Sequence, residues 1–128
     1  MTKQAILSQD APAPIGPYSQ AVRVGDWIFI SGQIPIDPAT GKMITGGVAT
    51  QTKQVLQNLQ AVLTAVGLNL DSIVKTTIYM TDLSMFAELN EVYANYFHPP
   101  FPARATVQVS ALPMGAQVEI EAIAYAGD

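Results

Sequence analysis

The sequence predicts an α+β fold in which two helices pack on one face of a mixed β-sheet. Stretches that alternate with a period of two residues, typical of strands, outnumber stretches with a helical period. Their expected order along the chain is β-β-β-α-β-α-β-β. The helices are too few and too clustered for a sheet that is covered on both faces, so one helical layer on one sheet is the better prediction.

The first part of the chain is predicted to hold a short strand, a fixed loop and a β-hairpin. The stretch "ILS" (6–8) can end the short strand, and three prolines fix the loop "QDAPAPIGPYS" (9–19). In "SQAVRVGDWIFISGQ", Gly25 and Asp26 separate two β-rich runs, as in a two-residue type II′ turn. The register that this turn sets pairs Val24 with Trp27, Val22 with Phe29, Gln20 with Ser31, Ser19 with Gly32 and Tyr18 with Gln33.

A long loop and the first helix are predicted next. The loop covers residues 34–47, "IPIDPATGKMITGG", which include two prolines and three glycines. From Val48 to Val66 apolar residues recur at helical spacing, and Gly67 is suited to end the helix. The apolar stripe expected to face the sheet consists of Val55, Leu59, Val62, Leu63 and Val66.

A strand at residues 72–80, "SIVKTTIYM", leads into the second predicted helix. This helix covers "DLSMFAELNEVYANYF" (82–97), with Asp82 or Ser84 as its N-cap, and Pro99 and Pro100 follow its end. The apolar stripe expected on it consists of Phe86, Leu89, Val92, Tyr93 and Tyr96.

Two strands complete the predicted sheet, "FPARATVQVS" (101–110) and "AQVEIEAIAY" (116–125), each with one apolar and one polar face. A turn between Leu112 and Gly115 would join them as a hairpin, in which Arg104 and Glu119 share a face about 13 Å apart. We expect the helices to cover the apolar face and the polar face to be open to another subunit. That polar face would carry Arg104, Thr106, Gln108, Gln117, Glu119 and Glu121.

Composition limits the classes of function. The 128 residues suit a single domain spanning residues 1–128, and only 12 % are charged, against about one quarter in an average chain. Such low charge favours burial of surface against other copies of the chain. The net charge of −4 and the lack of a basic run argue against nucleic-acid binding.

The location and the cofactor chemistry are predicted from absences in the sequence. No apolar run of about eighteen residues exists, and the first residues lack the apolar centre of a signal peptide, so we expect a cytoplasmic protein without membrane contact. The chain has no cysteine, and His98, its only histidine, stands beside two prolines. We therefore expect no metal site and no cofactor.

Three segments resemble the Rid family, the reactive intermediate deaminases, and above all its RidA (YjgF-like) subgroup. They are "PIGPYSQAV", "WIFISGQIPIDPATGKM" and "FPARATVQVSALPMGAQVEIEAIAY", and the resemblance extends over residues 6–126. It implies a chorismate-mutase-like α+β fold and a homotrimer with three clefts between subunits. The activity that it implies is hydrolysis of 2-imino acids to 2-keto acids and ammonia.

The resemblance also implies roles for individual residues. Arg104 matches the arginine that binds the substrate carboxylate, and Glu119 matches the glutamate that positions water. Tyr18 matches the tyrosine that closes the pocket, whereas Thr106 stands where many members have cysteine. The residues expected to line the substrate pocket are Tyr18, Ser31, Gly32, Asn90 and Thr106.

The proposed chemistry suits these residue types. An arginine can hold a carboxylate by two parallel hydrogen bonds, and a glutamate with a raised pKa can accept a proton from water near neutral pH. Small 2-imino acids, such as 2-iminobutanoate and 2-iminopropanoate, and enamine tautomers such as 2-aminoacrylate are the expected substrates.

Two kinds of alternative remain. A trimer that binds or senses keto acids or amino acids without turnover would need the arginine but not the glutamate. An RNA-directed role and a chaperone-like role find no supporting motif in this sequence. For single residues, Ser31 can simply satisfy nearby backbone, Asn90 can be a structural amide, and Glu121 is a rival of Glu119 for the catalytic role.

Overall fold

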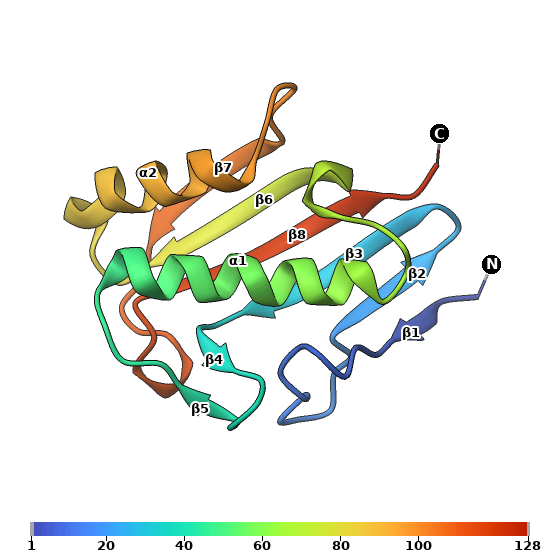
Figure 1. Ribbon diagram of the computed structural model, residues 1–128, viewed down its shortest axis with the longest axis horizontal. Coiled ribbons are helices and arrows are strands. Elements are labelled where there is room, and N and C mark those ends of the chain that lie inside the picture. Colours follow the sequence, from blue (N-terminus) through green and yellow to red (C-terminus); the bar gives the residue numbers. More distant parts are fainter. Residues whose placement is uncertain (1, 128) are drawn as a thin grey trace.

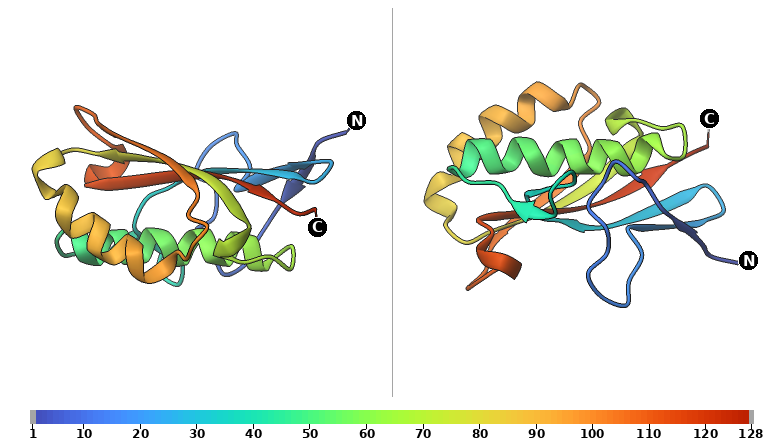
Figure 2. Two further views of the ribbon diagram at one scale, coloured as in Figure 1. Left: turned by 90° about the horizontal axis from the view of Figure 1, so that it is seen from above. Right: turned by 60° about the horizontal axis from the view of Figure 1, so that its bottom comes forward.

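The computed structural model describes residues 2–127 and consists of a sheet with two helices on one face (Figure 1). Helix α1 (Val48–Thr64) and helix α2 (Phe86–Tyr96) lie next to each other on this face, which Figure 2 shows edge-on. Within residues 2–127, the other face of the sheet carries no α-helix, as the edge-on view shows (Figure 2). This arrangement confirms the predicted α+β class.

The main sheet has six strands in the order β1-β2-β3-β8-β6-β7. All neighbouring strands are antiparallel except β6 and β7, which are parallel, so the sheet is mixed as predicted. The strands are β1 (Gln4–Ile6), β2 (Ala21–Val24), β3 (Trp27–Gln33), β6 (Ile73–Met80), β7 (Ala103–Gln108) and β8 (Val118–Tyr125).

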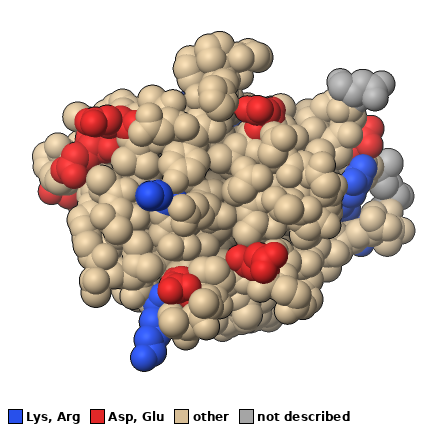
Figure 3. All heavy atoms as spheres, viewed as in Figure 1, with Lys and Arg blue, Asp and Glu red and all other residues tan. Residues whose placement is uncertain are grey.

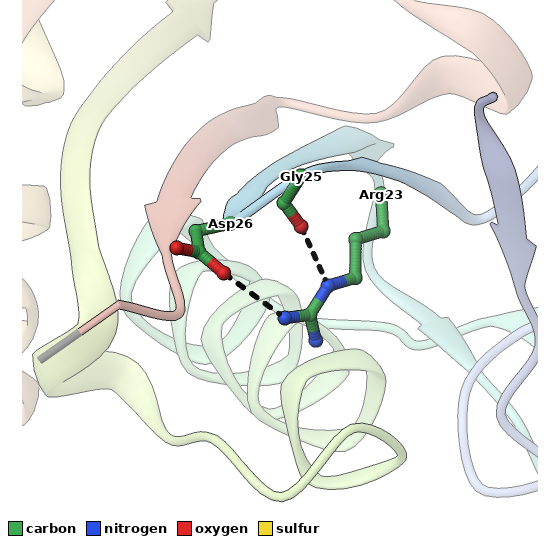
Figure 4. Close-up of polar contacts among 3 residues, drawn as sticks. All are labelled: Arg23, Gly25 and Asp26. Atoms are coloured by element: carbon green, nitrogen blue, oxygen red, sulfur yellow. Dashed lines mark hydrogen bonds and ion pairs between the residues drawn. The ribbon is translucent and has the colours of Figure 1, made fainter. Parts of the chain in front are cut away.

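The β2–β3 hairpin has the predicted turn, and the predicted register is confirmed where the strands pair, which is as far as Ala21 and Ile30. Beyond that point a backbone hydrogen bond still joins Gln20 to Ser31, whereas the pairs predicted for Ser19 and Tyr18 are not part of the ladder. Val24 pairs with Trp27, and Gly25 has a φ of 60°, as the first position of a type II′ turn requires. Arg23 supports the turn from outside: its Nε donates a hydrogen bond to the Gly25 carbonyl at 2.8 Å, and its Nη2 lies 3.5 Å from Asp26 Oδ1 (Figure 4). Both partners of this ion pair are exposed enough for water to screen it.

The predicted loop at residues 34–47 contains a small second sheet. Strands β4 (Ile36–Asp37) and β5 (Lys42–Met43) pair antiparallel, and Asp37 Oδ1 accepts a hydrogen bond from the Ala39 N–H at 2.8 Å within the turn. Strands of two residues are too short to show a period of two, so the composition of the segment indicates only a loop. The prediction of a loop without strands was wrong at these four residues.

Helix α1 packs the predicted stripe against the sheet. Four of its five residues, Val55, Leu59, Val62 and Leu63, have no exposed side-chain surface, and Val66 packs at the margin of the same core. At the end of the helix Gly67 has a φ of 76°, and the Leu68 N–H donates to the Leu63 carbonyl at 3.0 Å. This is the Schellman geometry that Gly67 predicts.

Helix α2 begins later than its sequence indicates. Asp82 Oδ1 accepts hydrogen bonds from the backbone and the side chain of Ser84, and so caps a 3₁₀ turn, Leu83–Met85, that precedes α2. Asp82 therefore caps the 3₁₀ turn, whereas the N-cap of α2 itself is Met85 without a side-chain hydrogen bond, so the predicted cap of this helix was wrong. Leu89 and Tyr93 of the predicted stripe are buried, and Phe86, Val92 and Tyr96 pack around them. Two further 3₁₀ turns cover Leu70–Ser72 and Pro113–Gly115.

The predicted hairpin between the last two strands does not form. Among the described residues, strand β7 pairs with β6 alone, in parallel, and β6 lies between β7 and β8. Arg104 is in register with the fully buried Thr76 and points to the helical face, as do Thr106 and Gln108. The assignment of these three residues to the open face, together with Glu119 and Glu121, was therefore wrong.

Apolar side chains gather on the face that no helix covers. Trp27 is 45 % exposed and Phe29 is 44 % exposed, and the ring of Trp27 lies 4.8 Å from that of Tyr125 on β8. On the helical side, small groups of charged side chains are separated by a mostly uncharged surface (Figure 3). Within residues 2–127, none of the helices is long and apolar enough to cross a membrane.

Candidate active site

Arg104 lies near the start of the edge strand β7, with its guanidinium over helix α2. Its Nη1 donates a hydrogen bond to Asn90 Oδ1 at 2.7 Å. The guanidinium carbon lies 5.3 Å from the centre of the Phe86 ring and 4.9 Å from the centre of the Tyr93 ring. These contacts are cation–π interactions. Three residues of one helix face thus support the guanidinium.

The charge of Arg104 is not neutralised within the protomer. Between residues 2 and 127 the ion pairs are Arg23 with Asp26 and His98 with Asp71, and neither includes Arg104. A cavity of about 440 Å³ opens beside the guanidinium. It is lined by Asn90, Tyr93, Ala94, Phe101, Pro102 and Arg104. A positive charge at an open, largely apolar cavity is suited to bind a small anion.

Tyr93 is buried beneath this cavity and is held by a hydrogen bond of its own. Its hydroxyl lies 2.8 Å from Thr76 Oγ1 on the neighbouring strand β6. Burial raises the pKa of Tyr93, while the bond to Thr76 and the charge of Arg104 act in the opposite direction. The ring therefore stays neutral near pH 7 and presents its face to the guanidinium.

Glu119 lies in a second cavity, of about 230 Å³, where strand β3 ends and strand β8 begins. A β-bulge in β3 between Ile30 and Gln33 brings Gly32 against it: a Cβ on Gly32 would lie 2.8 Å from Glu119 Cδ. Burial, and secondarily the charge of Glu121, raise the pKa of Glu119. The carboxylate thus has the electrostatic character of a general base that titrates closer to neutral pH.

Tyr18 lines the Glu119 cavity from the proline-rich loop. Its hydroxyl accepts a hydrogen bond from the Ile15 N–H at 3.4 Å, and its side chain is 49 % exposed. The buried Gln20 fixes the loop upstream, because its amide accepts from the Ser8 N–H at 2.6 Å and donates to the Pro12 carbonyl at 2.9 Å. Tyr18, Gly32 and Glu119 are therefore brought together as a second group.

Ser31 and Thr106 line neither the Arg104 cavity nor the Glu119 cavity. The Ser31 hydroxyl donates to the Ser19 carbonyl at 2.6 Å, which uses its only hydrogen and fits the alternative that it satisfies local backbone. Thr106 lies beside Leu83 and Phe86, and its buried Oγ1 has no hydrogen-bond partner among residues 2–127. In one protomer, neither hydroxyl faces the Arg104 or the Glu119 cavity.

Arg104 and Glu119 do not meet within one protomer. They lie on different strands with β6 between them, and their side chains leave opposite faces of the sheet. The predicted 13 Å separation along one shared face was wrong, because it assumed a β7–β8 hairpin. A single small molecule can touch both side chains only if they come from two copies of the chain.

Several supporting residues were absent from the predicted site. Phe86 and Tyr93 were assigned to the core of α2, although their spacing with Asn90 puts all three on one helix face. Nothing local in the sequence marks Gln20 or Thr76, since each acts through partners distant along the chain. Among residues 2–127, no three His, Cys, Asp or Glu side chains gather closely enough to hold a metal ion.

Comparison with known proteins gives consistent matches. The family model described as Endoribonuclease L-PSP matches residues 8–126. A RutC family protein from Pyrococcus horikoshii is 52 % identical over 96 % of this chain and 98 % of its own. The human protein named 2-iminobutanoate/2-iminopropanoate deaminase is 47 % identical over 99 % of this chain and 93 % of its own.

A solved structure supports the same assignment. The Rid family protein YyfA from Yersinia pestis superposes with a TM-score of 0.94 at 50 % identity, over 97 % of this chain and 99 % of that one. The chorismate-mutase-like fold and the sequence segments that resemble RidA are thus shared over nearly the whole length. The chain belongs to the Rid family, with its RidA (YjgF-like) members.

Proposed function

We propose that this protein hydrolyses reactive 2-imino acids to 2-keto acids and ammonia. The observation that carries the proposal is Arg104: its guanidinium is held flat by Asn90 and two aromatic rings, has no carboxylate partner in the protomer, and borders a cavity. The deaminase name of relatives at 47–49 % identity supports the same activity. The expected substrates are 2-iminobutanoate, 2-iminopropanoate and their enamine tautomers.

The proposed site lies between two protomers of a homotrimer. Arg104 and Asn90 of one copy would face Glu119, Gly32 and Tyr18 of its neighbour. This arrangement follows from the placement of the two groups on opposite faces of one sheet. The apolar surface around Trp27 and Phe29 supports close packing of another copy against the open face.

In the proposed reaction Arg104 binds the substrate carboxylate by paired hydrogen bonds and fixes the plane of the C=N group. A water molecule adds to the imine carbon, and Glu119 accepts one proton from it as the new C–O bond forms. Glu119 then gives this proton to the imine nitrogen, and a neutral carbinolamine results. In the second step Glu119 takes the proton of the new hydroxyl group and passes it to the nitrogen as the C–N bond breaks, so that ammonia leaves and the keto acid forms.

Glu119 is suited to both proton transfers. Its raised pKa reduces the difference in pKa between this carboxylate and the groups that it deprotonates and reprotonates. This smaller difference favours action first as a general base and then as a general acid. Glu121, its rival, is exposed on the same face of β8 and does not line the Glu119 cavity. We therefore assign the catalytic role to Glu119.

Two other functions are less well supported. A protein that only binds or senses keto acids gains nothing from a partly buried carboxylate, such as that of Glu119, next to the bound anion. RNA cleavage is suggested by the name of the family model. RNA binding usually needs a continuous basic surface. The net charge of this protein is −4, and the basic residues visible on its helical side are separated from one another (Figure 3).

The test is to generate 2-iminobutanoate with an amino-acid oxidase and to measure its conversion to 2-oxobutanoate with and without the protein. We expect acceleration that is abolished in Arg104→Ala and reduced at least about 100-fold in Glu119→Gln. Arg23→Ala and Glu121→Gln are the matched controls and should retain most of the activity. Equal rates with and without the wild-type protein would reject the deaminase function.

A further inference from the structure

A closed chain of contacts joins the backbone of Arg104 to its own guanidinium. The backbone of Arg104 is in register with Thr76 on β6. Thr76 Oγ1 is hydrogen-bonded to the Tyr93 hydroxyl at 2.8 Å, and the face of the Tyr93 ring meets the guanidinium. Thr76 thus lies beside the backbone of Arg104, Tyr93 contacts its guanidinium, and one buried hydrogen bond joins Thr76 to Tyr93.

The Tyr93 ring has little freedom to move. The residue is 6 % exposed, and its ring stacks on Phe97 with 4.3 Å between the ring centres. Thr76 is fully buried on β6, between the edge strand β7 and β8. A displacement of the ring would therefore break the Thr76 bond, disturb the stacking on Phe97, or both.

Asn90 adds a constraint on rotation within the plane. Its amide oxygen binds Nη1 of Arg104, and no other hydrogen bond of this guanidinium is formed within residues 2–127. A neutral amide leaves the positive charge in place, whereas a carboxylate would neutralise it. Most of the N–H groups of the guanidinium fork remain available for a ligand.

From this geometry we propose that Thr76 and Tyr93 are positioning residues, which hold the guanidinium of Arg104 in the plane that receives the substrate carboxylate. Asn90 then determines which edge of the guanidinium faces that carboxylate. The inference rests on the proposed function for the identity of the anion. Neither Thr76 nor the Tyr93 hydroxyl is assigned any contact with the substrate. Their effect is exerted through Arg104 alone.

The experiment compares Thr76→Val, Tyr93→Phe and the double variant. Binding of 2-oxobutanoate is measured by calorimetry, and KM and kcat are measured with 2-iminobutanoate. Each single variant should weaken binding and raise KM by about threefold to tenfold with a small change in kcat. The double variant should bind as well as either single variant, because both changes remove the same hydrogen bond.

Two further variants separate positioning from general stability. Thr76→Ser keeps the hydroxyl and should restore the wild-type KM. Thr52→Val alters another fully buried threonine, whose Oγ1 has no partner among the described residues, and should leave binding unchanged. If Thr76→Val fails to fold, Tyr93→Phe and Thr76→Ser still test the proposal.

The outcomes distinguish this inference from the proposed function. Wild-type affinity and KM in folded Thr76→Val and Tyr93→Phe would overturn the positioning role, even if the deaminase activity is confirmed. Binding of 2-oxobutanoate that is weakened in both variants, without turnover by the wild-type protein, would support the positioning role and reject the deaminase. Additive losses in the double variant would also overturn it.

Discussion

At the scale of single residues, the carboxylate of Glu119 occupies the space that a side chain at position 32 would fill. Gly32 has no positive φ, so its backbone conformation suits any residue, and the need for glycine comes from the close approach of Glu119. From the sequence alone, a glycine at this strand end indicates that another group approaches the backbone closely. The neighbour that makes glycine necessary lies 87 residues further along the chain and is known only from the fold.

The substitution Gly32→Ala should therefore impair catalysis more than folding. The new Cβ would lie 2.8 Å from Glu119 Cδ, which forces the carboxylate to move. We expect kcat/KM to fall by about tenfold to 100-fold, because small displacements of a reacting group are costly. Gly47→Ala is the control, since a Cβ there meets nothing within 4 Å. Unchanged kinetics in Gly32→Ala would show that the position of Glu119 is not critical.

Glu119 should also destabilise the protein in its ionised form. Its pKa is higher in the folded state than in the unfolded state, so folding is penalised once the pH rises above the unfolded value. Glu119→Gln should accordingly raise the free energy of unfolding at pH 7 to 8, and this gain should vanish near pH 3. Urea unfolding at fixed protein concentration measures it. A variant less stable than wild type at pH 8 would contradict the assignment.

At the scale of elements, the hairpin and the two helices could be predicted, whereas the position of β7 could not. A two-residue turn fixes the register of β2 and β3 from adjacent residues alone. The alternation in β7 gives its two faces but not its partner, and the competing choice was between the next strand in sequence and β6 across helix α2. Pairing with β6 places the Arg104 side chain on the helical face, opposite to the predicted face, and separates it from Glu119.

The proline-rich loop that carries Tyr18 depends on Gln20. This buried amide satisfies backbone groups of Ser8, Ala11 and Pro12, so Gln20→Ala leaves several of them without partners. We expect a loss of about 2 kcal/mol in the free energy of unfolding and a rise in KM. The exposed Gln9 is the control, and Gln9→Ala should have neither effect. A wild-type KM in Gln20→Ala would show that this loop does not affect the substrate site.

At the scale of the whole molecule, the proposed site is divided into two halves that one protomer does not bring together. Arg104 lies on the helical side of an edge strand, and Glu119 lies on the opposite face, where β3 ends and β8 begins. The low charge content and the exposed aromatic residues of the uncovered face fit assembly with further copies. Composition can indicate that assembly, but it does not indicate which residues meet across the interface.

Complementation between two inactive variants tests this arrangement most directly. Arg104→Ala and Glu119→Gln protomers are unfolded together in equal amounts, refolded and assayed with 2-iminobutanoate, and each variant refolded alone serves as the control. Random assembly into cyclic trimers leaves about one quarter of the clefts with both native side chains. We predict about one quarter of the wild-type rate from the mixture; a mixture no faster than the separate variants would contradict a site shared between neighbours.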